Sequence, residues 1–218
     1  GLSNALNNLG ALYRRLNKHQ LASEAYQESL ELAWETGDHV SVASVLNNLG
    51  EIQRYAQNYQ EALGYYQQAF DMGMELHDPY TTGTIANNTG LTYAEMKEWE
   101  KAVDWYEKSL KHKAKHSDLH GQAITLNNLG VAFENLGNYP NALSSYQEAI
   151  ELFKKIGDKT FAAAGLINLS QPPIAKTMSA EQRMNHLIEA EELILQTETK
   201  EHLELVRKLK DQIRDSHD

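Results

Sequence analysis

No cysteine occurs in the 218-residue sequence, which excludes disulfide bonds, thiolate metal sites and cysteine nucleophiles. The absence of cysteine fits a reducing compartment and predicts a cytoplasmic protein. Long apolar runs are also missing, because polar residues interrupt every apolar stretch before the ~18 residues that a membrane span needs. Positive charge is scarce: the formal net charge is −10, whereas nucleic-acid binding depends on clustered Lys and Arg. We expect neither a membrane protein nor a nucleic-acid-binding protein.

A repeat with a period of 40 residues organises the sequence. A period of this length predicts a stack of similar structural units. The segment Asn7-Asn8-Leu9-Gly10 recurs at 47–50 and 127–130 and, with Thr89 in place of leucine, at 87–90; Ile167-Asn168-Leu169-Ser170 is a weaker fifth copy. Three further columns keep the same register without a gap. They are Ala22, Ala62, Ala102 and Ala142; Tyr26, Tyr66, Tyr106 and Tyr146; and Asp38, Asp78, Asp118 and Asp158.

Each unit is predicted to contain two helices. Apolar residues between about 40 and 56 recur at steps of three and four, which is the spacing of one helical face, and a second helix is expected over about 60–76. The Asp column lies where each first helix should begin, where a carboxylate can accept hydrogen bonds from first-turn amides. Pro79 and Pro140 stand at predicted first-turn positions, where a missing N–H has little cost.

The residues of these columns resemble the tetratricopeptide repeat. Leu49 and Gly50 in the first helix, followed by Ala62, Tyr66 and Ala69 in the second, match its Leu-Gly and Ala-x3-aromatic-x2-Ala pattern. The 40-residue unit is similar to the long repeats of kinesin light chains, spindle-orientation adaptors and bacterial peptide-signal receptors. The resemblance implies an all-α, right-handed α-solenoid of helix-turn-helix repeats that binds extended peptides in its concave groove.

The pattern breaks near residue 170, which predicts two regions. Residues 1–170 should hold four full units and the start of a fifth, and residues 171–218 a divergent C-terminal helical cap or connector. Pro172-Pro173 should stop the first helix of the fifth unit. The segment 179–182 is a capping-box pattern for a helix to about Gln196, and an apolar stripe over 203–213 predicts another. These last helices can cap the stack, connect to another domain or fold back into the groove.

Helical geometry separates the packing side of each first helix from the side that faces the groove. At 100° per residue, Leu6, Leu9, Gly10 and Tyr13 point toward the partner helix, and positions 4, 8, 11 and 15 point away. Applied to every unit, this placement predicts a peptide-binding surface, to which we add the neighbouring Arg54. The predicted binding residues are Asn8, Arg15, Asn48, Glu51, Arg54, Tyr55, Asn88, Leu91, Ile124, Asn128, Val131 and Asn168.

Two chemical features of this surface indicate the kind of ligand. The Asn column offers a donor and an acceptor in every unit, so it can bind the backbone of an extended peptide; alternatively, these amides bond within the scaffold. Arg15 and Arg54 favour an acidic segment of the partner, because a guanidinium can form two parallel bonds with a carboxylate. The alternative is that these arginines pair with scaffold carboxylates.

Other signals favour neither catalysis nor metal binding. His112, His116 and His120 have the four-residue spacing of a zinc site, but Asp118 should begin a new helix before the third, and the intervening lysines indicate a solvated basic face. No nucleophile–base pair or phosphate-binding Gly loop is present in the sequence. We expect a protein that is not an enzyme and that holds no metal and no cofactor.

The predicted function is a protein–protein interaction module, an adaptor or scaffold that binds an extended peptide or protein segment. Two alternatives use the same fold. One is a regulatory or sensor domain that controls an attached signalling output. The other is a structural unit that associates with copies of itself, since an open helical stack can add further repeats at its ends.

Overall fold

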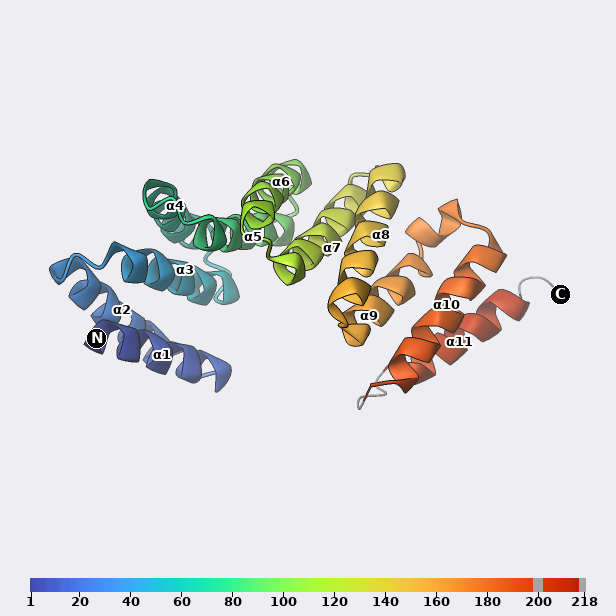
Figure 1. Cartoon of the computed structure of the whole chain (residues 1–218), viewed down its shortest axis with the longest axis horizontal. Coiled ribbons are helices and arrows are strands. Elements are labelled where there is room, and N and C mark those ends of the chain that lie inside the picture. Colours follow the sequence, from blue (N-terminus) through green and yellow to red (C-terminus); the bar gives the residue numbers. More distant parts are fainter. Residues whose placement is uncertain (198–201, 216–218) are drawn as a thin grey trace. The chain divides into compact units, whose positions relative to one another are not determined.

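The computed structural model describes residues 1–197 and 202–215, and all regular elements in these ranges are helices (Figure 1). The all-α fold predicted from the periodicity is thereby confirmed. The chain divides into two compact units, unit 1 (residues 1–117) and unit 2 (residues 118–218). Among the described residues, no helix has the length and apolar character that would let it cross a lipid bilayer.

Unit 1 consists of three helix pairs. The two helices of each pair pack against each other, and the second helix of one pair packs against the first helix of the next. This arrangement confirms the helix-turn-helix repeat. The helices are α1 (Leu2–Arg15), α2 (His19–Glu35), α3 (His39–Tyr55), α4 (Tyr59–Glu75), α5 (Pro79–Glu95) and α6 (Trp99–Lys115).

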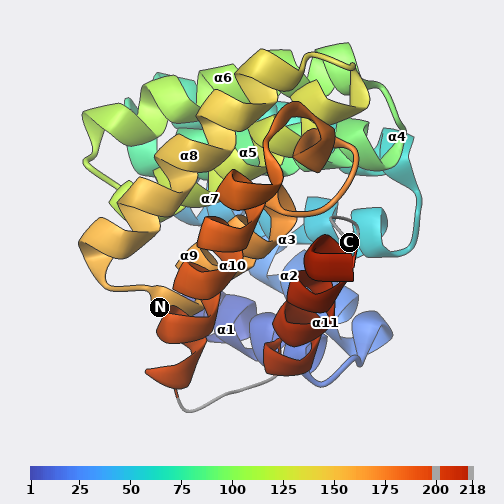
Figure 2. The same cartoon turned by 90° about the vertical axis from the view of Figure 1, so that its right-hand side faces the viewer.

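Unit 2 contains one further pair of this kind, followed by helices that depart from the repeat. The shorter α9 packs against both α8 and α10, and α11 lies beside α10 (Figure 2). The short helix η1 (Ile174–Thr177) follows the two prolines at 172 and 173. The helices are α7 (Leu119–Asn135), α8 (Tyr139–Ile156), α9 (Lys159–Leu169), α10 (Ala180–Leu195) and α11 (Leu203–Asp215).

Aspartate begins the first helix of each later pair, as the sequence predicts. The side chain of Asp38 accepts a hydrogen bond from the backbone N–H of Ser41 at 3.1 Å, and the other three aspartates of the column accept from first-turn amides in the same way. Pro79 is the first residue of α5, and Pro140 is the second residue of α8. These contacts satisfy amides that a helix leaves unpaired at its N-terminus.

A residue with positive φ stands in every turn from α1 to α9, at intervals of 20 residues. Three of them are glycines, which adopt this backbone conformation at no steric cost. The other five carry side chains, with φ between 53° and 62°. The turn residues are Asn17, Gly37, Gln57, His77, Lys97, Ser117, Gly137 and Gly157.

The conserved spacing of glycine and tyrosine within the repeat marks the place where the two helices of a pair cross. A Cβ atom on Gly50 would lie 2.6 Å from Cε1 of Tyr66, and Gly10 faces Tyr26 at the same distance. The tyrosine ring therefore occupies the space that a side chain at position 50 would need. All four tyrosines of the column are at most 2% exposed. Ala62, predicted to lie at this crossing, is also fully buried.

The core of unit 1 runs from pair to pair. Val45, Leu49 and Ile52 of α3 pack against Ala22 and Tyr26 of α2. A second cluster joins α2, α3, α4 and α5 around buried residues that include Tyr66 and Ile85.

The first pair departs from the predicted packing. Leu9 is 37% exposed, whereas its counterpart Leu49 is 2% exposed. The reason is that α2 and its tyrosine cover Leu49 from the preceding pair, and none of the described helices stands in that position before α1.

The C-terminal helices of unit 2 share one core with its repeat helices. Leu187 of α10 and Val206 of α11 are fully buried in a cluster that also contains Tyr146 and Leu166. The predicted capping box is present, because Ser179 and Gln182 exchange hydrogen bonds at the start of α10. The helix then continues to Leu195, as expected from the sequence.

Candidate functional site

A row of polar side chains lies on the first helices of unit 1 and joins neighbouring pairs. The side-chain amide of Asn48 donates to Oδ1 of Asn7 at 2.8 Å. The side-chain amide of Asn88 donates to Oδ1 of Asn47 at 3.0 Å and to Oε1 of Glu51 at 3.4 Å. Thus Asn48 and Asn88, which the sequence placed in the groove, each bond to the asparagine that precedes the groove asparagine of the preceding pair.

Two ion pairs also join the first helices of neighbouring pairs. Arg14 pairs with Glu51, and Arg54 pairs with Glu95. Arg54 is only 7% exposed, and its guanidinium carbon lies 4.6 Å from the centroid of the Tyr55 ring. Arg54 therefore already has an anionic partner from the next pair.

A pocket opens at the C-terminal end of α1 and at the start of α2. It has a volume of about 390 Å³ and is lined by Arg14, Arg15, Asn17, His19 and Tyr55. We call it the Arg–Tyr pocket. Arg15 and His19 are exposed, and the rings of His19 and Tyr55 lie 6.3 Å apart between centroids. Tyr55 is 55% exposed, so that an aromatic face and cationic groups are open to a ligand.

The remaining predicted residues lie on both units. Asn8 is exposed on α1, and Leu91 is half-buried on α5. In unit 2, Val131 is 37% exposed on α7. On the same helix Ile124 and Asn128 are half-buried, and Asn168 is exposed on α9.

Glu95, Arg14 and His19 belong to this surface but were not among the predicted binding residues. Glu95 and Arg14 become important because they are partners in the ion pairs. His19 joins the pocket because the turn after α1 returns the chain beside Tyr55. The repeat pattern offers a signal for Glu95, which falls in the same column as Tyr55 and Arg15, but it offers none for His19, whose type does not recur.

Helix pairs that pack on their neighbours in the sequence, with polar side chains along the first helices, define an α-helical repeat protein of the protein-interaction class. The chain belongs to the tetratricopeptide repeat family, whose model matches residues 1–75, 41–115 and 81–155 in overlapping segments. No curated protein matches the sequence.

Solved structures share this fold at low sequence identity. BtubC (BKLC) from P. vanneervenii aligns with a TM-score of 0.76 and 19% identity over 95% of this chain and 84% of its own. RapI in its apo form aligns with a TM-score of 0.82 and 18% identity, over 95% of this chain and 58% of its own. The third structure is a Signal Transduction ATPase with Numerous Domains from Pyrococcus horikoshii, which has a tetratricopeptide repeat sensor. It aligns with a TM-score of 0.78 and 20% identity, over 90% of this chain and 31% of its own. These similarities concern the fold.

Proposed function

We propose that the chain is a non-enzymatic interaction module that binds an extended peptide or protein segment along α1, α3 and α5, with an acidic residue of the ligand in the Arg–Tyr pocket. The observation that carries this proposal is the pocket itself. Arg15 is exposed beside Tyr55 and forms no ion pair with any described residue, unlike Arg14 and Arg54. A guanidinium with a free planar fork is well suited to a carboxylate.

The asparagine row retains capacity for a ligand although it bonds within the scaffold. A side-chain amide has two N–H donors and an oxygen with two lone pairs. Asn48 uses one donor toward Asn7, and the amide oxygens of Asn48 and Asn88 accept no hydrogen bond from another described residue. The unused groups can bind the N–H and C=O of an extended backbone, as the sequence suggested.

The test is a selection from a library of extended peptides, with the 218-residue chain immobilised, followed by affinity measurements on the selected peptides. We expect enrichment of Asp or Glu near one end of the peptide. Arg15→Gln should weaken binding about tenfold, since a hydrogen bond to a charged group is worth about 1.5–3 kcal/mol. Lys97→Gln, which removes the same charge from an exposed turn of unit 1, is the matched control.

A second pair of variants separates ligand contacts from scaffold contacts in the asparagine row. Asn8 is exposed and forms no hydrogen bond with a described side chain, so Asn8→Ala should reduce affinity and leave the melting temperature unchanged. Asn88→Ala should reduce both, because Asn88 also bonds to Asn47 and Glu51. Unchanged affinity of the folded protein in both variants would show that the row is purely structural and that the ligand binds elsewhere.

Self-association is the second candidate, favoured by the outer face of the first pair. Leu2 is 65% exposed and Leu12 is 50% exposed, whereas their counterparts Val42 and Ile52 are 0% and 6% exposed. Arg14 is paired with Glu51, which leaves Arg15 as the charged side chain of α1 open to a second copy, and α2 has four glutamates and no Lys or Arg, so two copies can pair α1 with α2. Light scattering should then show a dimer that Leu12→Glu dissociates; a monomer at all concentrations would contradict this.

A further inference from the structure

The second half of α6 concentrates positive charge in an otherwise acidic chain. Between Glu107 and Asp118 there is no acidic residue, and six residues in this stretch are basic. Lys108 lies 3.9 Å from the centroid of the Trp105 ring. The basic residues are Lys108, Lys111, His112, Lys113, Lys115 and His116.

The repeat itself shows that this charge is a local departure. Forty residues earlier, α4 carries Asp71 and Glu75 at the positions of Lys111 and Lys115. Packing of the helix therefore does not demand a positive charge there. At these two repeat positions, the reversal of charge is therefore a feature specific to α6.

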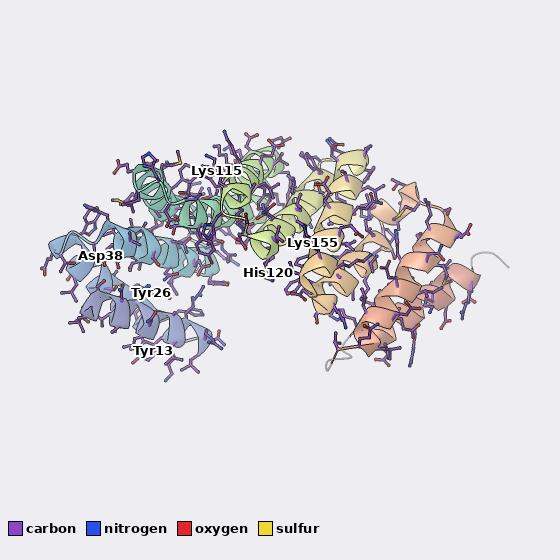
Figure 3. All side chains as sticks on the ribbon, in the orientation of Figure 1. Tyr13, Tyr26, Asp38, Lys115, His120 and Lys155 are labelled. Atoms are coloured by element: carbon purple, nitrogen blue, oxygen red, sulfur yellow. The ribbon has the colours of Figure 1, made fainter. Side chains whose placement is uncertain are left out.

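Part of this charge lines a pocket within unit 1. The pocket has a volume of about 310 Å³ and lies between the end of α4, the first turn of α5 and the last turns of α6. Its basic groups come from two segments: His77 from the turn between α4 and α5, and His112 and Lys115 from α6; Figure 3 shows Lys115 near the end of that helix. We call it the His–Lys pocket. Its other lining residues are Gly73, Met74, Asp78, Pro79 and Thr82.

The only carboxylate that lines this pocket among the described residues is already engaged. Asp78 accepts hydrogen bonds from the backbone N–H groups of Tyr80 at 3.0 Å and Thr81 at 3.2 Å, as the cap of α5. Neither Lys111 nor Lys115 forms an ion pair with a described carboxylate. Lys115, the lysine that lines the pocket, therefore lacks a neutralising partner among the described residues.

The environment of His112 reflects this excess of positive charge. Burial lowers the pKa of its imidazole, and the ammonium groups of Lys115 and Lys111 lower it further. From α4, the uncharged ring of Phe70 packs edge-on against it, with 6.1 Å between centroids. A bound anion would reverse the electrostatic part of this shift and favour protonated His112.

We propose that the His–Lys pocket binds a dianionic oxyanion, a phosphate or sulfate group held by Lys115, His112 and His77. The volume is at the lower end of the range for small-molecule sites. The charged lysine and imidazole N–H groups are donors of the kind that bind phosphate oxygens. Because Nδ1 of His77 contacts the backbone oxygen of Glu75 at 2.9 Å, His77 would donate to the anion through Nε2–H of its protonated ring. This site is separate from the proposed peptide surface, because it lies at the α4–α5 turn and not on the face of the first helices that carries the asparagine row.

The pH dependence of binding follows from the histidine. In the free protein the imidazole of His112 loses its proton at a lower pH than usual, and bound anion favours the protonated form. Affinity should therefore increase as the pH falls. Sulfate is the probe for this measurement because it stays a dianion over the relevant range, so that any pH dependence belongs to the protein.

The experiment follows the imidazole signals of the 218-residue chain by NMR during titration with sodium sulfate, at constant ionic strength maintained with sodium chloride. We expect a saturable shift of the His112 signal and tighter binding at mildly acid pH than at mildly alkaline pH. Lys115→Gln should weaken sulfate binding about tenfold. Lys108→Gln, on the same helix but outside the pocket, removes an equal charge and should leave the affinity unchanged.

The source of the oxyanion is distinguished by comparing inorganic phosphate with a phosphoserine dipeptide. Binding of inorganic phosphate alone identifies a free ion, and equal or tighter binding of the dipeptide identifies a phosphorylated side chain. Equal weakening by Lys115→Gln and Lys108→Gln would overturn the proposal, since sulfate would then act as a general counterion. A His112 signal that responds equally to chloride and sulfate would overturn it as well.

Discussion

The glycine in each first helix is required by the tyrosine that it faces. Gly50 has no room for a side chain beside the ring of Tyr66, whereas a Cβ on Gly64 would have no atom within 4 Å. Both glycines lie inside helices, α3 and α4, where glycine has a conformational cost. At position 50, glycine allows close packing against Tyr66, which offsets its conformational cost. At position 64, no such contact offsets that cost.

This contrast predicts opposite effects of the same substitution. Gly50→Ala should lower the free energy of unfolding by about 1–3 kcal/mol, the range for overpacking a well-packed site. Gly64→Ala should raise it by about 0.5–1 kcal/mol, because alanine has the higher helix propensity. Urea unfolding of the two variants measures both values. If both substitutions changed the free energy of unfolding in the same direction, Tyr66 would not be the obstacle to a side chain at position 50.

Individual contacts between repeats were harder to predict than the repeat positions. The columns of Gly, Tyr and Asp could be read directly because identical residues recur at a fixed period. The bonds from Arg14 to Glu51 and from Asn88 to Asn47 depend on how one pair is rotated relative to the next. The sequence period sets the length of a unit but not this rotation, so whether the polar groups face a ligand or each other was left open.

Helix ends are determined by two kinds of residue, a cap before the helix and a turn residue after it. At the start of α3, both carboxylate oxygens of Asp38 accept from Ser41, one from its backbone N–H and one from its hydroxyl. Both hydrogen bonds lower the pKa of the Asp38 carboxyl from its usual 3.8, and the bond from the hydroxyl has the larger effect. Asn58, at the start of α4, makes no such bond to its helix.

The lowered pKa gives the cap a defined pH dependence. Because the carboxyl is more acidic in the folded chain, its contribution to stability is present above pH 3.8 and is lost as the pH falls through the lower folded value. Asp38→Ala should therefore reduce the melting temperature near neutral pH, and the difference from wild type should shrink in acid. Asn58→Ala is the control and should show a small effect at every pH; a constant Asp38→Ala difference in acid would contradict the capping role.

The turns offer a second test at the level of elements. Gln57 has φ of 62° and Gly137 has φ of 72°, and both link the first helix of a pair to the second. A left-handed conformation costs a residue with a side chain about 1–2 kcal/mol relative to glycine. Gln57→Gly should therefore raise the melting temperature and Gly137→Ala should lower it. Calorimetry measures the melting temperature of both variants. A lower melting temperature for Gln57→Gly would show that the side chain of Gln57 stabilises the turn.

Across the whole chain, the sequence predicted the repeating part more completely than its ends. The capping box and the helices after residue 178 were expected from local patterns, and the structure contains them. The burial of Val206 in one cluster with Tyr146 was not predictable, because no repeat relates α11 to the helices that it covers. The exposure of Leu9 has the same origin, since it depends on what lies before α1 and not on the residue itself.

In a stack of this kind, a destabilising substitution should affect mainly the helix pairs next to it. In unit 1, each helix pair packs against the adjacent pairs, so stability is close to a sum of local terms and neighbour terms. Gly50→Leu, which places a large side chain against Tyr66, should therefore loosen α1 to α5 far more than α8 to α11.

Hydrogen exchange measured by mass spectrometry tests this difference. We expect faster exchange in peptides from residues 1–95 and near wild-type exchange in peptides from residues 139–195. Gly64→Ala is the control: it should not accelerate exchange in residues 1–95 and should leave residues 139–195 close to wild type. Equal acceleration along the chain in Gly50→Leu would mean that the described helices unfold as a single cooperative body, and the neighbour-only account of the repeat would be wrong.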